Sequence, residues 1–254
     1  MAQQLDTIIS EAELYDIFNA NCVEDIDWYK TVLSGSTSVL ELGIGTGRVA
    51  IPLSKMGIKV FGVDNSADML SRLEEKIKKE NITNISFQNQ DFRHLSLDST
   101  YDYILFPFCT FNFLRTIEDQ TKCLISIKNN MHKDTKIIFD LLTLNTFFDS
   151  FNNDKISYFD TIKNKDDSIM EIYISSRFDQ TNQIFSQERI FRKYSTYKLE
   201  AEYHTVMKNR FFFLGEFKLL LEKCGYVIQE TIGSYTHSPY TPNSKCLIVI
   251  ASMK

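Results

Sequence analysis

Two kinds of residue near the start of the chain could recognise a nucleoside: closely spaced glycines and the carboxylates that flank them. Gly43, Gly45 and Gly47 follow a short strand-like segment, and Asp64 closes a second apolar run at 59–64. Glycine lets the backbone approach a ligand closely, and a carboxylate at the end of the next strand can accept hydrogen bonds from ribose hydroxyls. Glu41 adds an acid two residues before the turn. This order predicts the nucleotide-binding edge of an α/β domain.

The glycine spacing separates two classes of nucleotide site. A dinucleotide fingerprint, G-x-G-x-x-G, needs a third glycine where this chain has Arg48, because that glycine eases packing of the helix on the strand. An NAD-dependent oxidoreductase is therefore the less favoured alternative.

The pattern E-x-G-x-G-x-G from Glu41 to Gly47 resembles the first motif of the class I S-adenosylmethionine-dependent methyltransferases. The resemblance continues through the first half of the chain and returns near its C-terminus. It implies S-adenosylmethionine as cofactor, with the glycine loop under its methionine part, and direct in-line methyl transfer to an acceptor. It also implies a doubly wound, mostly parallel, seven-stranded Rossmann-like sheet. A non-catalytic module that binds S-adenosylmethionine is the alternative to an enzyme.

The resemblance carries over to individual positions. Asp64 matches the ribose-binding acid, Asp91 the acid that meets the adenine amino group, and Phe92 the residue that covers the ring. Tyr15 resembles a tyrosine that closes over the methionine carboxylate in small-molecule N-methyltransferases. The full set of cofactor-binding residues that we expect is Tyr15, Glu41, Gly43, Gly45, Gly47, Arg48, Asp64, Asn65, Met69, Asp91, Phe92 and Phe106.

The acceptor site should lie beyond the strand that ends at Phe106, where ligands of open parallel sheets bind. Relatives that methylate nucleic-acid amines often carry a D/N-P-P-Y-type motif there, whereas this chain has Phe106-Pro107-Phe108-Cys109. That departure favours the small-molecule branch of the family, with N- or O-methylation. A hydroxyl acceptor would gain from a general base. His94 and His204 are the available candidates, and neither is assigned a catalytic role.

Composition limits the partners. The chain has 254 residues, a net charge of −5 and no dense basic block, which argues against nucleic acid. No apolar run approaches the ~20 residues of a membrane helix, so no membrane partner is expected. Five scattered cysteines without a C-x-x-C pair indicate a reducing cytoplasm, and the four histidines show no metal-ligand spacing.

Hydrophobic periodicity places the elements within a single methyltransferase domain. Residues 1–35 should form an N-terminal helical cover, and 46–56 the helix after the glycine turn. Strands at 59–64, 85–90, 103–106 and 136–142 alternate with helices at 66–80 and 118–131, which implies a parallel sheet. Residues 153–209 alternate with period two and predict an inserted antiparallel meander. The family resemblance implies that this sheet is a lid, a homodimer surface or both. A helix at 215–224 and strands at 226–232 and 245–251 follow.

Overall fold

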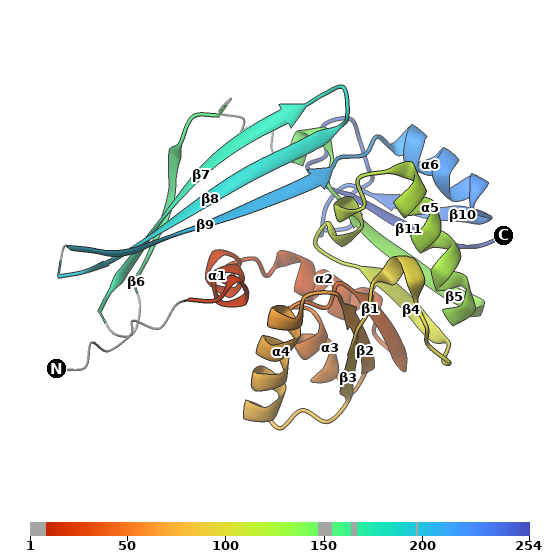
Figure 1. The fold of residues 1–254 in the computed structure, drawn as a ribbon. Coiled ribbons are helices and arrows are strands. Elements are labelled where there is room, and N and C mark those ends of the chain that lie inside the picture. Colours follow the sequence, from red (N-terminus) through yellow and green to blue (C-terminus); the bar gives the residue numbers. More distant parts are fainter. Residues whose placement is uncertain (1–8, 147–153, 164–166, 197) are drawn as a thin grey trace.

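A seven-stranded, mostly parallel sheet organises the chain (Figure 1). The computed structural model describes residues 9–146, 154–163, 167–196 and 198–254. The strand order is β10-β11-β5-β4-β1-β2-β3, and β11 is antiparallel to both of its neighbours. The strands are β1 (Ser38–Leu42), β2 (Lys59–Asp64), β3 (Ile85–Asn89), β4 (Tyr101–Phe106), β5 (Met131–Leu141), β10 (Tyr226–Ile232) and β11 (Leu247–Met253). The predicted fold class is confirmed.

Helices cover both faces of this sheet, because each buried strand carries apolar side chains on both sides. They are α1 (Glu11–Phe18), α2 (Glu24–Val32), α3 (Ala50–Ser54), α4 (Ala67–Lys79), α5 (Ile117–Ser126) and α6 (Leu214–Lys223), with short 3₁₀ turns η1 (Phe92–His94), η2 (Thr110–Phe113) and η3 (Ile127–Asn130). In β1, Leu40 and Leu42 pack with α5 and α6, whereas Val39 packs with α2, α3 and α4. Glu41 therefore points to the side of α2.

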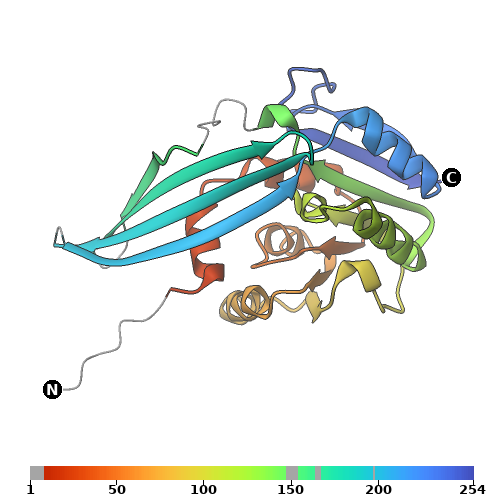
Figure 2. The same cartoon turned by 45° about the horizontal axis from the view of Figure 1, so that its top comes forward.

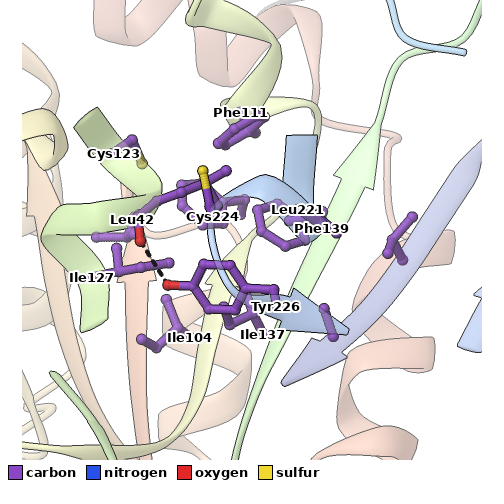
Figure 3. Close-up of a cluster of buried hydrophobic side chains, with 14 of the residues drawn as sticks. Leu42, Ile104, Phe111, Cys123, Ile127, Ile137, Phe139, Leu221, Cys224 and Tyr226 are labelled. Carbon is purple, nitrogen blue, oxygen red and sulfur yellow. Dashed lines mark hydrogen bonds between the residues drawn. The ribbon is translucent and has the colours of Figure 1, made fainter. Parts of the chain in front are cut away.

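Tyr226 lies in the core beneath α5 and α6, among aliphatic, cysteine and aromatic side chains (Figure 3). Its phenol ring is fully buried, and its hydroxyl donates a 2.6 Å hydrogen bond to the carbonyl of Leu124. Phe106 and Phe139 stack at 4.9 Å between ring centroids in the same cluster. Because buried hydroxyls are costly unless they are hydrogen-bonded, this one bond lets a tyrosine fill a core position.

A second sheet lies between β5 and α6 in the sequence and extends away from the first (Figures 1 and 2). It is an antiparallel meander of β6 (Ser157–Lys163), β7 (Ile169–Asp179), β8 (Ile184–Ser195) and β9 (Lys198–Arg210), in that order. Of the stretch 153–209 predicted for it, residues 153, 164–166 and 197 lie outside the described residues. α1 lies against one face of the sheet, where Leu14 packs with Met170, Ile172 and Phe191.

The N-terminal part and the first crossover differ in detail from expectation. Residues 1–8 of the predicted cover lie outside the described residues, and the rest forms two helices, α1 and α2. The helix predicted at 46–56 is shorter, because α3 covers only 50–54. Gly47 adopts a φ of +82°, which a right-handed helix excludes, and Pro52 falls in the first turn, where its missing N–H costs nothing.

Candidate functional site

The glycine turn after β1 is fixed by its surroundings at two positions and open at the third. A Cβ atom on Gly43 would lie 2.4 Å from Thr110 Cγ2, and one on Gly47 would lie 2.5 Å from Leu73 Cδ1. At Gly45 the nearest atom to such a Cβ would be 3.9 Å away. Gly43 and Gly47 are thus required by packing, while the space over Gly45 can accept a ligand.

The carboxylate of Asp64 is held beside that space by backbone donors. The Gly45 amide donates to Asp64 Oδ2 and the Ser66 amide donates to Oδ1, each at 2.9 Å. Burial raises the pKa of Asp64, while these backbone bonds favour the ionised form. Each carboxylate oxygen keeps a further lone pair, so the side chain can still accept hydrogen bonds from two hydroxyls.

Glu41 is a buried carboxyl group with an unsatisfied atom. Its side chain is 2% exposed, and Oε2 has no hydrogen-bond partner within the part of the chain that the structure describes. Burial raises the pKa of Glu41 to about 8, against an opposing effect of the Arg48 charge. A buried acid of this kind is costly to ionise unless a cation comes close to it.

Arg48 is committed to a different acid. Its guanidinium donates to Asp25 Oδ1 at 2.8 Å and to the carbonyl of Cys22 at 2.8 Å, and it lies 4.1 Å above the ring of Phe108. Asp25 is 3% exposed, so the pair is nearly buried. Arg48 therefore fastens the start of α2 to the glycine turn, and its charge is already balanced.

Tyr15 comes to the same place from α1. Burial raises the pKa of its phenol, against an opposing effect of the nearby Arg48 charge. Both residues line a cleft of about 310 Å³ between α1, α2 and the glycine turn. Asp16 holds α1 there, because it accepts hydrogen bonds from Thr46 Oγ1 at 2.6 Å and from Lys76 Nζ at 2.7 Å.

The remaining expected cofactor residues follow β2, β3 and β4 along the same edge. The carboxylate of Asp91 is gripped by the guanidinium of Arg93, with Nε 2.9 Å from Oδ2, and this lowers its pKa. Asn65 is exposed, and Met69 is half-buried behind the Ser66 cap of α4. Phe92 is half-buried against Phe106, with ring centroids 6.1 Å apart.

Phe106 lies in the core. Its side chain is fully buried and stacks on Phe139, so it offers only its backbone to a ligand at this edge. The apolar run that ends β4 continues into the α5–α6 core, and burial of the large ring there outweighs exposure at the edge.

Neither of the two candidate histidines is buried at the glycine turn. His94 is exposed in η1. His204 lies on the face of the antiparallel sheet opposite to α1, where its ring nitrogens are 3.0 Å from Glu188 and from Glu202. These carboxylates raise the pKa of His204. The contacts of His204 are therefore those of an ion pair at the protein surface.

Asp140 lies at the same edge and is not among the residues predicted from the sequence. It lies at the end of β5, is 1% exposed, and accepts hydrogen bonds from Tyr235 Oη at 2.7 Å and from the Phe108 amide at 3.1 Å. Burial raises its pKa to about 6. Phe108 and Cys109, in the loop after β4, adopt φ values of +50° and +63°, which are unfavourable for such side chains. Asp140 thus holds a strained loop at the carboxyl edge.

A signal for Asp140 was present in the sequence. The run from Ile137 to Leu142 is apolar apart from this one acid. A carboxyl group inside a buried strand needs a partner or a function. The partner, Tyr235, lies 95 positions away and could not be identified without the fold.

The residues present fit the cofactor that the resemblance implies. Gly45 leaves an open space beside Asp64, which can accept hydrogen bonds from a ribose. The unsatisfied Oε2 of Glu41 suits a cationic group at the end of β1. Within the described ranges, no group of three His, Cys, Asp or Glu side chains could hold a metal ion.

Comparisons with known proteins point to methyltransferases. Residues 39–134 match the family model described as a methyltransferase domain. The chain is 28% identical over 218 residues to the cypemycin N-terminal methyltransferase of Streptomyces sp, covering 86% of this chain and 83% of that protein.

Two solved structures share the fold. One is an S-adenosylmethionine-dependent methyltransferase from Clostridium acetobutylicum ATCC 824, with a TM-score of 0.78, 17% identity and coverage of 95% of this chain and 97% of that chain. The other is the sugar N-methyltransferase KedS8 from Streptoalloteichus sp ATCC 53650, with a TM-score of 0.75, 14% identity and coverage of 100% and 99%. The similarity therefore includes the antiparallel sheet. No helix in the described ranges combines the length and apolarity needed to cross a bilayer.

Proposed function

Because this chain is a class I S-adenosylmethionine-dependent methyltransferase, we propose that it methylates a nitrogen or oxygen atom of a small-molecule acceptor. The observation that carries the proposal is the open space over Gly45, with the hydrogen-bonded carboxylate of Asp64 on one side and the unsatisfied carboxyl of Glu41 near it. KedS8 is named a sugar N-methyltransferase and the cypemycin enzyme an N-terminal methyltransferase, which supports a nitrogen nucleophile.

Each half of the site has a task in this proposal. Asp64 would hold the ribose, Glu41 would hold the ammonium of the methionine part, and Tyr15 would close over its carboxylate. The cofactor, when bound, supplies a methyl group activated by the positive charge on sulfur. Positioning the acceptor against it can contribute effective molarities of about 10⁵–10⁸ M.

Asp140 is the group that we propose for proton transfer. A protonated amine cannot attack, because its lone pair is occupied. Asp140 lies beside the loop after β4, where the acceptor should bind, and a pKa of about 6 lets its carboxylate take a proton near neutral pH. The phenol of Tyr29 is fully buried near both Asp140 and Glu41, and its hydroxyl has no hydrogen-bond partner in the described ranges.

We propose that the antiparallel sheet roofs the acceptor site. Phe185 of β8 packs with Leu142, and Cys109 of the loop after β4 packs against the same cluster. A roof of this kind excludes water and restricts the acceptor to a small molecule. If the sheet instead forms a homodimer surface, size-exclusion chromatography with light scattering will give twice the chain mass.

Calorimetry tests the cofactor half of the proposal. The wild-type chain should bind S-adenosylmethionine and S-adenosylhomocysteine, whereas binding of NAD alone would indicate an oxidoreductase. Asp64→Ala should raise the dissociation constant for S-adenosylhomocysteine at least about tenfold, since it removes hydrogen bonds to a charged group. Asp98→Ala, at an exposed carboxylate in the loop before β4, is the matched control and should change nothing.

A mass-spectrometric screen tests the acceptor half. Incubation of metabolite extracts with S-adenosylmethionine should yield a product heavier by the mass of CH₂. Tight cofactor binding without any such product, across amines and alcohols, would favour a non-catalytic binding module.

A further inference from the structure

One face of β8 carries a polar row between two apolar contacts. Alternate residues of a strand share a face, so Phe191, Arg189, Gln187 and Phe185 point the same way. Phe191 packs against α1, and Phe185 packs against Leu142 and the loop after β4. Arg189 and Gln187, which we call the polar row, therefore lie on β8 between its contact with α1 and its contact with the loop after β4.

Arg189 is half-buried but has no acidic partner. Its Nε donates to Gln187 Oε1 at 2.8 Å, one Nη is 3.4 Å from Met207 Sδ, and its guanidinium carbon lies 3.9 Å above the ring of Phe18. No carboxylate of the described residues comes within 4.0 Å of it. All other half-buried arginines of the described ranges pair with an acid: Arg48, Arg72, Arg93, Arg192 and Arg210.

This arrangement leaves donors available. A guanidinium has five N–H donors, and two are used by Gln187 and Met207, so three remain. Burial without an acid lowers the pKa of Arg189 to about 10, and its positive charge reaches Tyr15 and Cys22 at the cofactor edge. Removing a cation from water without a counter-charge is unfavourable, so the site favours an anion. The planar fork of arginine matches carboxylate and phosphate groups.

We propose that Arg189 anchors an oxyanion group, a carboxylate or a phosphate, carried by the methyl acceptor. The proposal rests on the proposed function, because it places the acceptor beneath the polar row. Gln187 holds the guanidinium in orientation, and the Phe18 ring supports its flat side. The nucleophilic atom of the acceptor then lies toward Asp140 and the glycine turn, at the other end of the molecule from its anion.

The test follows the Nε–H proton of Arg189 by nitrogen-15 NMR in the wild-type chain saturated with S-adenosylhomocysteine. Arg189→Met identifies the signal by its loss. Sodium acetate, inorganic phosphate and sodium chloride are titrated at matched ionic strength. Acetate or phosphate should shift the Arg189 signal with a saturable millimolar dissociation constant, and the more effective of the two identifies the anion. The signal of Arg192, which is on the opposite face of β8 and paired with Glu202, should not move.

The variants give a second readout. In Arg189→Met the response of the Gln187 amide to the effective anion should weaken at least about tenfold, and Arg189→Lys should retain part of it. Equal shifts with chloride, or equal shifts at Arg189 and Arg192, would overturn the proposal. So would weaker binding of S-adenosylhomocysteine to Arg189→Met, because the arginine would then serve the cofactor. Failure of the wild-type chain to bind either sulfur nucleoside would instead refute the proposed function.

Discussion

Glu41 offers a test in which stability and cofactor affinity should change in opposite directions. The acid is 2% exposed, lies at the end of β1, and has a pKa raised to about 8 by burial. In the unfolded chain the same group has a pKa of 4.5. Below pH 4.5 it is protonated in both states, so its ionisation costs nothing. Between pH 4.5 and 8 the unfolded chain gives up the proton while the folded chain keeps it, and stability is lost as the pH rises.

The size of this effect follows from the two pKa values. The full difference corresponds to about 5 kcal/mol above pH 8 and about 3 kcal/mol at pH 7, in a chain without cofactor. Glu41→Gln removes the titration. The free energy of unfolding of the variant, relative to wild type, should therefore rise by about 3 kcal/mol between pH 4 and pH 7. Any cost of burying the amide itself does not depend on pH and drops out of this comparison.

Urea denaturation at a series of pH values measures this difference. Glu11→Gln is the matched control, because Glu11 is exposed on α1, and its relative stability should stay nearly constant. A Glu41→Gln variant whose relative stability does not depend on pH would refute the reasoning, since the carboxyl would then ionise without cost.

Cofactor binding should have the opposite requirement and favour the ionised form of Glu41. If an ammonium binds near Glu41, the acid must ionise, so close to one proton should be released at pH 7. Calorimetry with S-adenosylhomocysteine in buffers of different ionisation enthalpy measures that proton. Glu41→Gln should bind more weakly and release none. Equal proton release in both chains would exclude Glu41 from the cofactor site.

Two further predictions concern the acceptor edge and the glycine turn. Asp140→Asn should lower the methylation rate at pH 7 at least about tenfold. It should also remove the decline in rate that wild type shows below a pH of about 6, where Asp140 takes up a proton. A pH profile of initial rates that is the same in both chains would rule out Asp140 as the base. Gly47→Ala should cost about 2 to 4 kcal/mol in urea denaturation, because its φ is +82° and its Cβ would meet Leu73. Gly35→Ala, with a φ of +85° and open space, is the control and should lose only about 1 kcal/mol; equal losses would contradict the packing argument.

The sequence predicted the parallel sheet well, because a buried strand is a short apolar run with a recognisable end. β2 at 59–64 and β10 at 226–232 match their predicted bounds. The helix after the glycine turn was predicted too long, since the pattern at 46–49 is compatible with a helix and only the conformation of Gly47 excludes it.

The residues of the candidate site could be predicted where they and their partners belong to one sequence motif. They could not be predicted where the partner is distant in the sequence. Gly45 and Asp64 are 19 positions apart within one strand–helix–strand unit, and their hydrogen bond follows from that unit. Asp25, which balances Arg48, comes from a helix that no motif marks. The face of the sheet on which Arg189 lies, toward α1, depends on the register of the whole meander.

The position of β11 has a consequence for synthesis. This strand lies between β5 and β10. One edge of β5 and one edge of β10 therefore stay unpaired until residues 247–253 have left the ribosome. The meander between β5 and α6 is made of hairpins and can form earlier, because each of its strands pairs with the next in the sequence. During translation the nascent chain therefore passes through a stage in which the antiparallel sheet is complete and the main sheet is not. Holdase chaperones that bind apolar strand edges should act on this protein until its last strand is inserted.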